Sequence, residues 1–496
     1  MHKALYLFAV TTMLTSCSLA PDFVAPDMKV PEQFKEVAPQ VDILQEQGRW
    51  KALEPLAQED RGQWWKIFQD STLDDLQKQA AEANPNLKIA ASRVEQARGL
   101  AQSRSPSLIP DLDVGANAVR AKPADASNAA FGGQATTLKP YNMFSVGGVL
   151  SYELDLLGRV HDGYRAYMFD TQAQEANYRS VLLALQADVA QHYYMLRALD
   201  SQYILLRDTL AEREEELRIM QKKMELGAVS ESDFAKTQAD VATAKTELTA
   251  TERERNSTQN MLATLLGKMP SEFSWEGKPL DGVPPAIPAG LPSELLARRP
   301  DIAAAMANMQ AANLRIGVAR TAFFPRIALT ANGGVESTEL GDLFQWSSRS
   351  WALGQTAGSA ITMPIFDSGR NFGNLDSAKA AYEEAVATYR QQVLVAFRDA
   401  ENSLSDQRLL AEQSKTVEQS AIAAKRSFEL IKKRFEEGDV DHIDLVINQR
   451  DSVAAERVYI QTQLQRFVAT ITLIRALGGG WEEPKPVQET PSTDIN

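Results

Sequence analysis

Hydrophobic and polar residues alternate with a period of two in four short stretches of the chain. In NMFSVGGVLSYELDLLG, residues 142–158, most even positions are apolar and most odd positions are small or polar. DLDVGANAV alternates likewise, and RIALTANG and WALGQTAGSAITMPI do so more weakly. This period predicts strands with one apolar and one polar face. The sequence therefore predicts two β-hairpins, at 108–156 and 324–367.

Each predicted strand pair is followed by a proline-free run, at 159–226 and 370–437. As α-helix, each run would be on the order of 100 Å long, which exceeds an ordinary globular helix and predicts coiled-coil packing. Apolar residues recur with coiled-coil spacing in the second run, at Leu375, Tyr382, Tyr389 and Ala396. We interpret the intervening charged residues as a solvated face.

Glycines predict where the long helices end. Gly227 and Gly438 stand where C′ glycines terminate a helix. Helices over 231–266 and 442–477 are predicted to return from these turns, and shorter helices over 85–105 and 300–321 precede the strands. The sequence therefore predicts one antiparallel helical hairpin in each half of the chain.

The two halves repeat each other. Pro85 and Pro300 are separated by 215 residues, and so are Pro110 and Pro325. Arg159 and Arg370, Gly227 and Gly438, Asp233 and Asp444, Gln238 and Gln449, and Gly267 and Gly478 all keep an offset of 211. Constant offsets over several landmarks indicate a duplication. The predicted organisation is therefore a signal peptide (1–16), an N-terminal segment (17–84), a first repeat (85–270), a Pro-rich linker (271–299), a second repeat (300–478) and a tail (479–496).

The predicted strands require an oligomer. Their length suits a tilted membrane strand of about 9–11 residues, and their two faces suit lipid and water. A sheet edge exposed to lipid is not viable, and known membrane barrels start at about eight strands. Three copies would pool twelve strands and leave an aqueous lumen, whereas a barrel of eight would be filled by its side chains. The alternative is a soluble β-sandwich joined to a coiled-coil stalk.

The N-terminus has the pattern of an export signal. Lys3 precedes the apolar run ALYLFAVTTML, which is too short to span a bilayer. LTSC then resembles a lipobox, so Cys17, the only cysteine, is expected to be the lipidated first residue of the mature chain. Ser18 follows in place of the aspartate that would signal inner-membrane retention, so we expect outer-membrane delivery. The alternative is an ordinary signal peptide cut nearby, with Cys17 incidental.

Composition excludes several classes of function. A net charge of −13 argues against a nucleic-acid binder. With four histidines and one cysteine, the sequence has few of the side chains that bind zinc or copper, so we expect no metal site. The sequence also contains no phosphate-binding loop, HExxH or GxSxG motif. We therefore expect no catalytic residues and no cofactor other than the acyl and diacylglycerol lipid on Cys17. An enzyme that uses Asp or Glu without a motif remains an alternative.

Several segments resemble the TolC/OprM family of outer membrane factors, in particular its lipoprotein efflux-channel branch, which is NodT-like. They are the lipobox followed by LAPDFVAP, the run RRPDIAAAMANMQAANLRIGVARTAFFP and the duplicated hairpins. The resemblance implies a mixed α and β membrane protein: a homotrimeric twelve-stranded barrel, four strands per chain, continuous with a periplasmic α-helical tunnel. It also implies a periplasmic adaptor and an inner-membrane transporter, of the RND type, as partners.

The resemblance further assigns roles near the helix turns. Asp444 falls where the family has one acidic-ring aspartate, and Asp233 and Ser232 match polar positions of the other hairpin; these three are the expected periplasmic gate. The family's second ring position is Ile447 here, and Val440 replaces its tip arginine. The expected adaptor-contact tips are Leu226, Gly227, Ala228, Glu437, Gly438 and Asp439. The alternative for both aspartates is stabilisation of a helix N-terminus, worth about 0.3–1 kcal/mol.

The expected function is a passive outer-membrane exit duct for drugs or other small toxic compounds, lying in the outer membrane of a Gram-negative bacterium and extending into the periplasm. Two rivals remain open. One is the exit duct of a type I protein-secretion system, and the other is a lipid-anchored coiled-coil scaffold that conducts nothing.

Overall fold

The computed structural model describes residues 18–31, 33–36, 61–122, 139–285, 287, 298–352 and 359–479. The predicted signal peptide, Cys17 and most of the predicted tail lie outside these residues. Two compact units make up the chain. The first comprises residues 1–26, 93–174 and 305–389, and the second comprises residues 27–92, 175–304 and 390–496.

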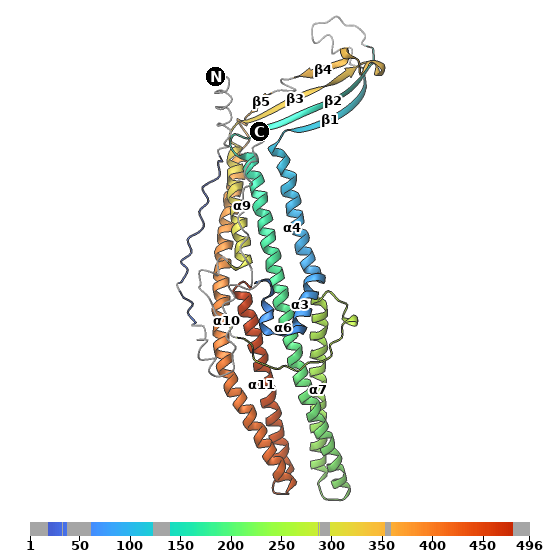
Figure 1. Ribbon diagram of the computed structural model, residues 1–496, viewed down its shortest axis with the longest axis vertical. Helices are drawn as coiled ribbons and strands as arrows, with labels where there is room; N and C mark the ends of the chain where they lie inside the picture. The colour runs from blue at the N-terminus through green and yellow to red at the C-terminus, as the bar shows by residue number, and fades with distance from the viewer. Residues whose placement is uncertain are drawn as a thin grey trace. The chain divides into compact units, whose positions relative to one another are not determined.

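The first unit contains an antiparallel sheet with the strand order β1-β2-β3-β4, in which β5 also pairs with β3 (Figure 1). The strands are β1 (Asp111–Ala121), β2 (Tyr141–Leu154), β3 (Arg326–Ser337), β4 (Arg349–Ala352) and β5 (Ser359–Thr362). The pairing of β2 with β3 joins the two repeats, and Gly147 stands opposite Gly334 in it. A Cβ atom on Gly334 would lie 2.3 Å from the Val146 carbonyl oxygen, so this close approach requires glycine. Both predicted hairpins therefore belong to one sheet.

The second predicted hairpin, 324–367, is less regular than its alternating pattern indicated. Six residues separate Ala352 from Ser359, but their partners on β3, Asn332 and Leu329, are separated by only two. β4 and β5 therefore share the fourth position of the sheet without forming one evenly paired strand. The expectation of a single continuous strand over WALGQTAGSAITMPI was wrong, because strand pairing depends on register with β3 as well as on local alternation.

The first residues that the structure describes are fastened to the helices of the first unit. Ser18 Oγ donates to Asp162 in α6 (Arg159–Glu225). In α9 (Pro300–Thr321), Asn313 Nδ2 donates to the Pro21 carbonyl at 2.8 Å and Arg320 to that of Leu19 at 3.0 Å. The N-terminal segment, residues 18–21, is therefore held by side chains of two helices.

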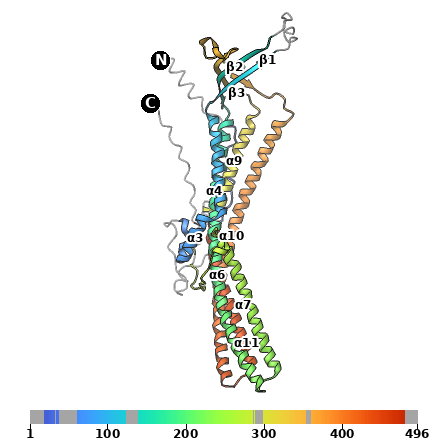
Figure 2. The ribbon, with the colours of Figure 1, turned by 90° about the vertical axis from the view of Figure 1, so that its right-hand side faces the viewer.

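The second unit contains most of two helical hairpins, because residues 159–174 of the first and 370–389 of the second are assigned to the first unit. α6 is followed by α7 (Glu231–Leu265), and α10 (Arg370–Glu436) by α11 (His442–Ala476). α6 and α10 each have 67 residues, and α7 and α11 each have 35. These bounds agree with the predicted helices to within a residue, and their equal lengths confirm the duplication. Figure 2 shows both hairpin turns at the same end of this unit.

Other helices match less completely. α4 (Pro85–Arg104) ends one residue before the predicted limit and continues as the 3-10 turn η2 (Ser105–Leu108). η1 (Arg61–Phe68) and α3 (Ser71–Ala83) lie in the N-terminal segment, for which the sequence predicted no element. The remaining short 3-10 turns are η3 (Pro270–Glu272), η4 (Leu340–Asp342) and η5 (Trp346–Ser348). No helix among the described residues combines the length and the apolar character that crossing a bilayer requires.

Aromatic side chains form the centre of the core of the second unit. Trp64 from η1 and Tyr193 and Tyr194 from α6 are almost completely buried. Tyr194 stacks on Phe467 of α11 with ring centroids 4.2 Å apart. Offset and edge-on aromatic pairs add stabilisation beyond the burial of area. The N-terminal segment and the second repeat therefore share one core with α6.

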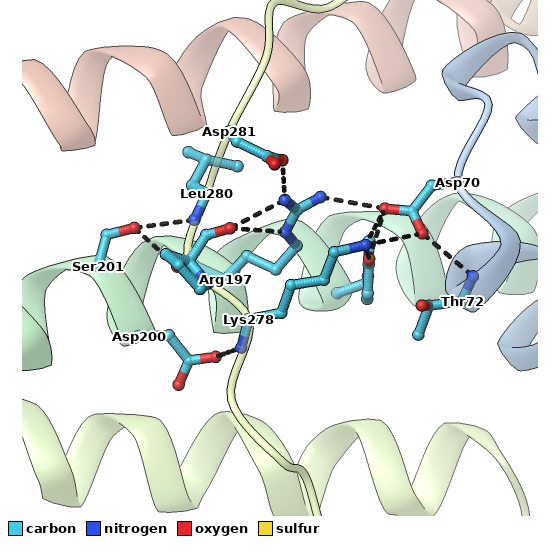
Figure 3. Close-up of polar contacts among 10 residues, drawn as sticks. Asp70, Thr72, Arg197, Asp200, Ser201, Lys278, Leu280 and Asp281 are labelled. Carbon is cyan, nitrogen blue, oxygen red and sulfur yellow. Dashed lines mark hydrogen bonds and ion pairs between the residues drawn. The ribbon is translucent and has the colours of Figure 1, made fainter.

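A buried polar cluster fastens the start of the inter-repeat linker to α6 (Figure 3). Arg197 is 3% exposed and makes ion pairs with Asp70, at 3.0 Å, and with Asp281 of the linker. It also donates to the Pro279 carbonyl at 2.8 Å. Lys278 Nζ lies 3.2 Å from Asp70. Burial raises the pKa of Asp70, but hydrogen bonds from Tyr193 and Lys278 outweigh that effect and keep the pKa below its usual value.

A second buried carboxylate, Asp200, completes this attachment. Trp275 Nε1 donates to Asp200 Oδ2 at 2.6 Å, and the Lys278 backbone N–H donates to the same oxygen at 2.8 Å. Arg255 of α7 pairs with Asp200 Oδ1 at 2.6 Å. Buried charges of this kind are stable only when paired and hydrogen-bonded. The cluster therefore sets the path of the linker over residues 275–281.

Candidate functional site

The two helical hairpins turn on glycines, as predicted. Gly227 has φ of 70° and Gly438 has φ of 81°. The Ala228 N–H donates to the Lys223 carbonyl and the Asp439 N–H to the Arg434 carbonyl, both at 2.8 Å. This is the Schellman arrangement, which satisfies carbonyls at a helix end. The predicted C′ roles of both glycines are confirmed.

The predicted adaptor-contact tips are at these turns and face solvent. Leu226, Gly227, Ala228, Glu437, Gly438 and Asp439 are all exposed, and Leu226 is 84% exposed. Asp439 forms an ion pair with Arg434 at 2.8 Å within its own hairpin. An exposed leucine at a tight turn, followed by the small residues Gly227 and Ala228, suits contact with another surface.

Asp233 is part of a helix cap. The Ser230 hydroxyl donates to Asp233 Oδ2 at 2.7 Å and accepts from the Asp233 N–H at 3.1 Å. The Ser230 hydroxyl thereby satisfies one of the free N–H groups at the start of α7, that of Asp233. The bond from Ser230 and that from Lys236 lower the pKa of the Asp233 carboxyl. Its neighbour Ser232 is exposed.

Asp444 lies in the first turn of α11 and its side chain faces solvent. Asn448 Nδ2 donates to its backbone carbonyl at 2.9 Å. Ile447 is 47% exposed one turn further along the helix. A single chain therefore presents Asp444 as an accessible charge near an exposed apolar residue.

One contact between the two hairpins involves a residue that was not among the predicted site residues. His442, at the start of α11, forms an ion pair through Nε2 with Glu216 Oε1 of α6. The hydrogen bond with Glu216 raises the pKa of the His442 imidazole above its ordinary value, against the effect of burial. His442 also lies edge-on to Phe435, with centroids 6.0 Å apart.

Further polar contacts join the hairpins away from the tips. Gln449 Nε2 donates to Glu212 of α6 at 2.8 Å, and Lys432 of α10 lies 3.5 Å from the same carboxylate. Arg450 and Arg457 of α11 pair with Asp240 and Glu247 of α7, the second pair at 3.3 Å. Hydrogen bonds and ion pairs, rather than a continuous apolar seam, join the hairpins at these positions. Such contacts separate at lower cost than a packed core because water can replace each of them.

A regular spacing could have revealed part of this interface. Asp240 and Glu247 on α7, and Arg450 and Arg457 on α11, are each one heptad apart, and both pairs join residues 210 positions apart. Complementary charges at heptad spacing are typical of paired helices. No comparable signal marks His442 and Glu216, whose pairing depends on how the hairpins pack. Within the described residues no cluster of three or more histidine, cysteine or acidic side chains could hold a metal ion.

The chain is similar to proteins of one family over most of its length. The family described as "Outer membrane efflux protein" matches residues 76–268 and 291–479. Outer membrane protein OprJ of Pseudomonas aeruginosa is 33% identical over 485 residues, which cover 96% of this chain and 95% of OprJ. Toluene efflux pump outer membrane protein TtgF of Pseudomonas putida is 32% identical over 97% of this chain and 98% of TtgF.

Solved structures share the fold. The Campylobacter jejuni CmeC outer membrane channel superposes with a TM-score of 0.86 at 26% identity, covering 95% of this chain and 96% of CmeC. The similarity includes both repeats and the sheet, because it extends over nearly the whole of both chains.

Proposed function

This chain belongs to the outer membrane efflux protein family, and from that premise we propose that it is the passive exit duct of a tripartite pump that expels small toxic compounds. It is an outer-membrane efflux component of a Gram-negative bacterium that extends into the periplasm. The family consists of channel-forming proteins. We assign this chain no catalytic step.

The sheet carries the argument for a channel. β1 is at one outer edge of the sheet and β4 and β5 are at the other, and neither edge has a further partner among the residues that the structure describes. Open edges are incompatible with hydrocarbon, so neighbouring copies must supply the missing strands. Four strand positions per chain and three copies give a closed barrel of twelve strands with room for a lumen.

The exposed hairpin turns offer a surface on which a pump partner could dock. An exit duct has no energy source of its own, so transport must be driven from the inner membrane. We propose that a periplasmic adaptor contacts Leu226, Gly227, Ala228, Glu437, Gly438 and Asp439, and that an RND-type transporter supplies the energy. The support is the exposure of these residues and their placement at the same end of the second unit.

We place the periplasmic gate at the hairpin ends, with Asp444, Asp233 and Ser232 as its polar residues. Asp444 is the residue best suited to face the pore, since it is exposed in the first turn of α11, whereas the Asp233 carboxylate is bonded to Ser230 and Lys236. Three symmetry-related carboxylates around a narrow axis would favour cations. Asp233 bonds to the N-cap residue Ser230 of α7. We propose that it affects the gate by holding the start of this helix in place.

Cys17 is proposed as the lipid attachment point. Ser18, the next residue, is held against α6 and residues 19–21 against α9, so a lipid on Cys17 would be tethered by a very short free segment. The anchor would then add to membrane attachment by the barrel without a flexible linker.

Single-channel recording in planar bilayers tests the proposed duct. The purified trimer should insert and give discrete conductance steps that are small until the adaptor is added. Deletion of the gene should sensitise cells to small toxic compounds and leave secreted proteins unchanged. An absence of conductance would favour the scaffold, and loss of a secreted protein without sensitisation would favour a secretion duct.

A further inference from the structure

A cavity of about 530 Å³ opens between the two helical hairpins in the second unit. One wall is the stretch of α6 from Ala211 to Lys223, and the opposite wall is formed by α10 from Phe428 to Glu436 with the first turns of α11. This volume lies within the range of about 300–1,000 Å³ that is typical of small-molecule sites. We call it the hairpin cavity.

The floor of the hairpin cavity is apolar and partly aromatic. Ile219 and Met220 contribute from α6, Phe428 and Phe435 from α10, and Leu445 from α11. Both aromatic rings already attract an ammonium group: Lys432 Nζ lies 5.9 Å from the centroid of Phe428, and Lys223 Nζ lies 5.9 Å from that of Phe435. The cavity therefore provides ring faces at cation–π distance.

Charges around the hairpin cavity favour a positive ligand. Four glutamates and two lysines line it, which leaves an excess of two negative charges when His442 is neutral and one when it is protonated. Glu436 is exposed and makes no ion pair with another described residue. Both lysines are exposed on flexible stems, so a ligand cation can replace their ammonium groups over the rings while they move into water.

We propose that the hairpin cavity is a binding site for an amphipathic organic cation, a positive charge carried on an apolar ring system. The rings of the ligand pack against Ile219, Phe428 and Leu445, and its charge lies near Glu436 and the aromatic faces. Because the walls belong to different hairpins, a bound ligand contacts both and holds them together. Its effect on conductance rests on the proposed channel function, but binding itself does not.

Binding to the purified, detergent-solubilised trimer tests the site directly. Rhodamine 6G, a fluorescent cation on a fused ring system, should bind saturably in a fluorescence polarisation titration. Fluorescein, a similar ring system with negative charge, should not. Equal binding of both dyes, or no saturable binding of rhodamine 6G, would overturn the proposal.

Matched variants on α10 locate the site. Phe428→Ala should weaken rhodamine 6G binding by about tenfold, since it removes a cation–π face and apolar contact. Leu430→Ala removes a side chain that is 53% exposed on the same helix but does not line the cavity, and should leave affinity unchanged. Glu436→Gln should weaken binding, whereas Glu429→Gln should not. Unchanged affinity in Phe428→Ala would contradict the proposed location.

A protection experiment avoids removing the ring. The sequence has a single cysteine, Cys17, so Ile219→Cys places one new thiol in the hairpin cavity and Leu430→Cys places one outside it. Rhodamine 6G should slow alkylation at position 219 and not at position 430, measured by peptide mass spectrometry. Equal rates with and without the dye at both positions would exclude the cavity.

The two proposals fail in different ways. If the protein forms no channel, planar bilayers show no conductance even without dye, whereas binding and protection are unaffected. If the site is absent, conductance is normal and rhodamine 6G neither binds nor protects. If both hold, rhodamine 6G should lower the rate of adaptor-induced opening in wild type and have a smaller effect in Phe428→Ala.

Discussion

His442 of α11 and Glu216 of α6 form an ion pair that joins the hairpin of the second repeat to that of the first. The pair is about four-fifths buried on both sides and lies beside the ring of Phe435. Asp240 of α7 strengthens the charge on His442, and Lys223 of α6 opposes it. We therefore expect the association of the hairpins to depend on pH.

The His442–Glu216 pair predicts the sign of that pH dependence. Because the hydrogen bond with Glu216 raises the folded-state pKa of His442 above its ordinary value of 6.5, the contribution to stability is complete below pH 6.5. It is lost as the pH rises through the raised folded-state pKa. The thermal midpoint of the detergent-solubilised trimer should therefore fall on going from pH 6 to about pH 9.

Glu216→Gln is the matched variant for this effect. It preserves the shape of the side chain but removes the charge, so the pH dependence of the midpoint should be clearly smaller than in wild type. An identical pH profile in the two proteins would show that His442 does not titrate against Glu216.

Asp444→Ala should reduce the cation preference of the channel. One carboxylate in water contributes up to about 1 kcal/mol at 4 Å, so the permeability ratio measured from reversal potentials should fall by about twofold or more. Asp451→Ala, on the exposed surface of the same helix, serves as control. A permeability ratio that matches wild type would remove Asp444 from the constriction.

Two glycine substitutions should have opposite effects on stability. A Cβ atom on Gly317 would lie 2.7 Å from the backbone nitrogen of Ala20. Gly317→Ala must therefore displace the N-terminal segment around Ala20, which should lower the free energy of unfolding by about 1–3 kcal/mol. Gly163 has no atom within 4 Å of such a Cβ, and Gly163→Ala should stabilise helix α6 by up to about 1 kcal/mol. Thermal midpoints and protease sensitivity near residue 20 distinguish them. Destabilisation by both, or by neither, would contradict the close packing at Ala20.

Asp70→Ala should strongly destabilise the second unit. Asp70 is 9% exposed, and its loss leaves Arg197 with one buried partner fewer, which typically costs about 3–5 kcal/mol. It also removes the cap that accepts from the Thr72 N–H at 3.1 Å. Asp208→Ala, which breaks an exposed pair with Arg207, should change stability by less than about 1 kcal/mol. Denaturant titration of the two variants should differ accordingly; similar midpoints would show that the cluster around Arg197 contributes little.

Cys17→Ala tests the lipid anchor. Intact mass spectrometry of mature wild-type protein should show the mass of a chain that begins at Cys17 plus its acyl and diacylglycerol groups, and Cys17→Ala should lack that added mass. If the wild-type mass corresponds to an unmodified chain cut elsewhere, the ordinary signal peptide is correct.

Local patterns in the sequence determined the elements of this protein. The proline-free runs, the glycines at 227 and 438 and the constant offset between repeats predicted α6, α7, α10 and α11 nearly to the residue. These features depend on interactions between close neighbours along the chain, such as backbone hydrogen bonds and the φ preference of glycine. Alternation likewise predicted β1 and β2.

Only the tertiary structure decided which distant residues meet. Asp70 and Arg197, 127 positions apart, pair because α3 and the linker pack on α6, and His442 reaches Glu216 because the two hairpins lie side by side. The division of the fourth strand position into β4 and β5 depends on register with β3. Such contacts depend on how segments pack against each other. The repeat of apolar residues within one segment does not specify which other segment it packs against or in which register.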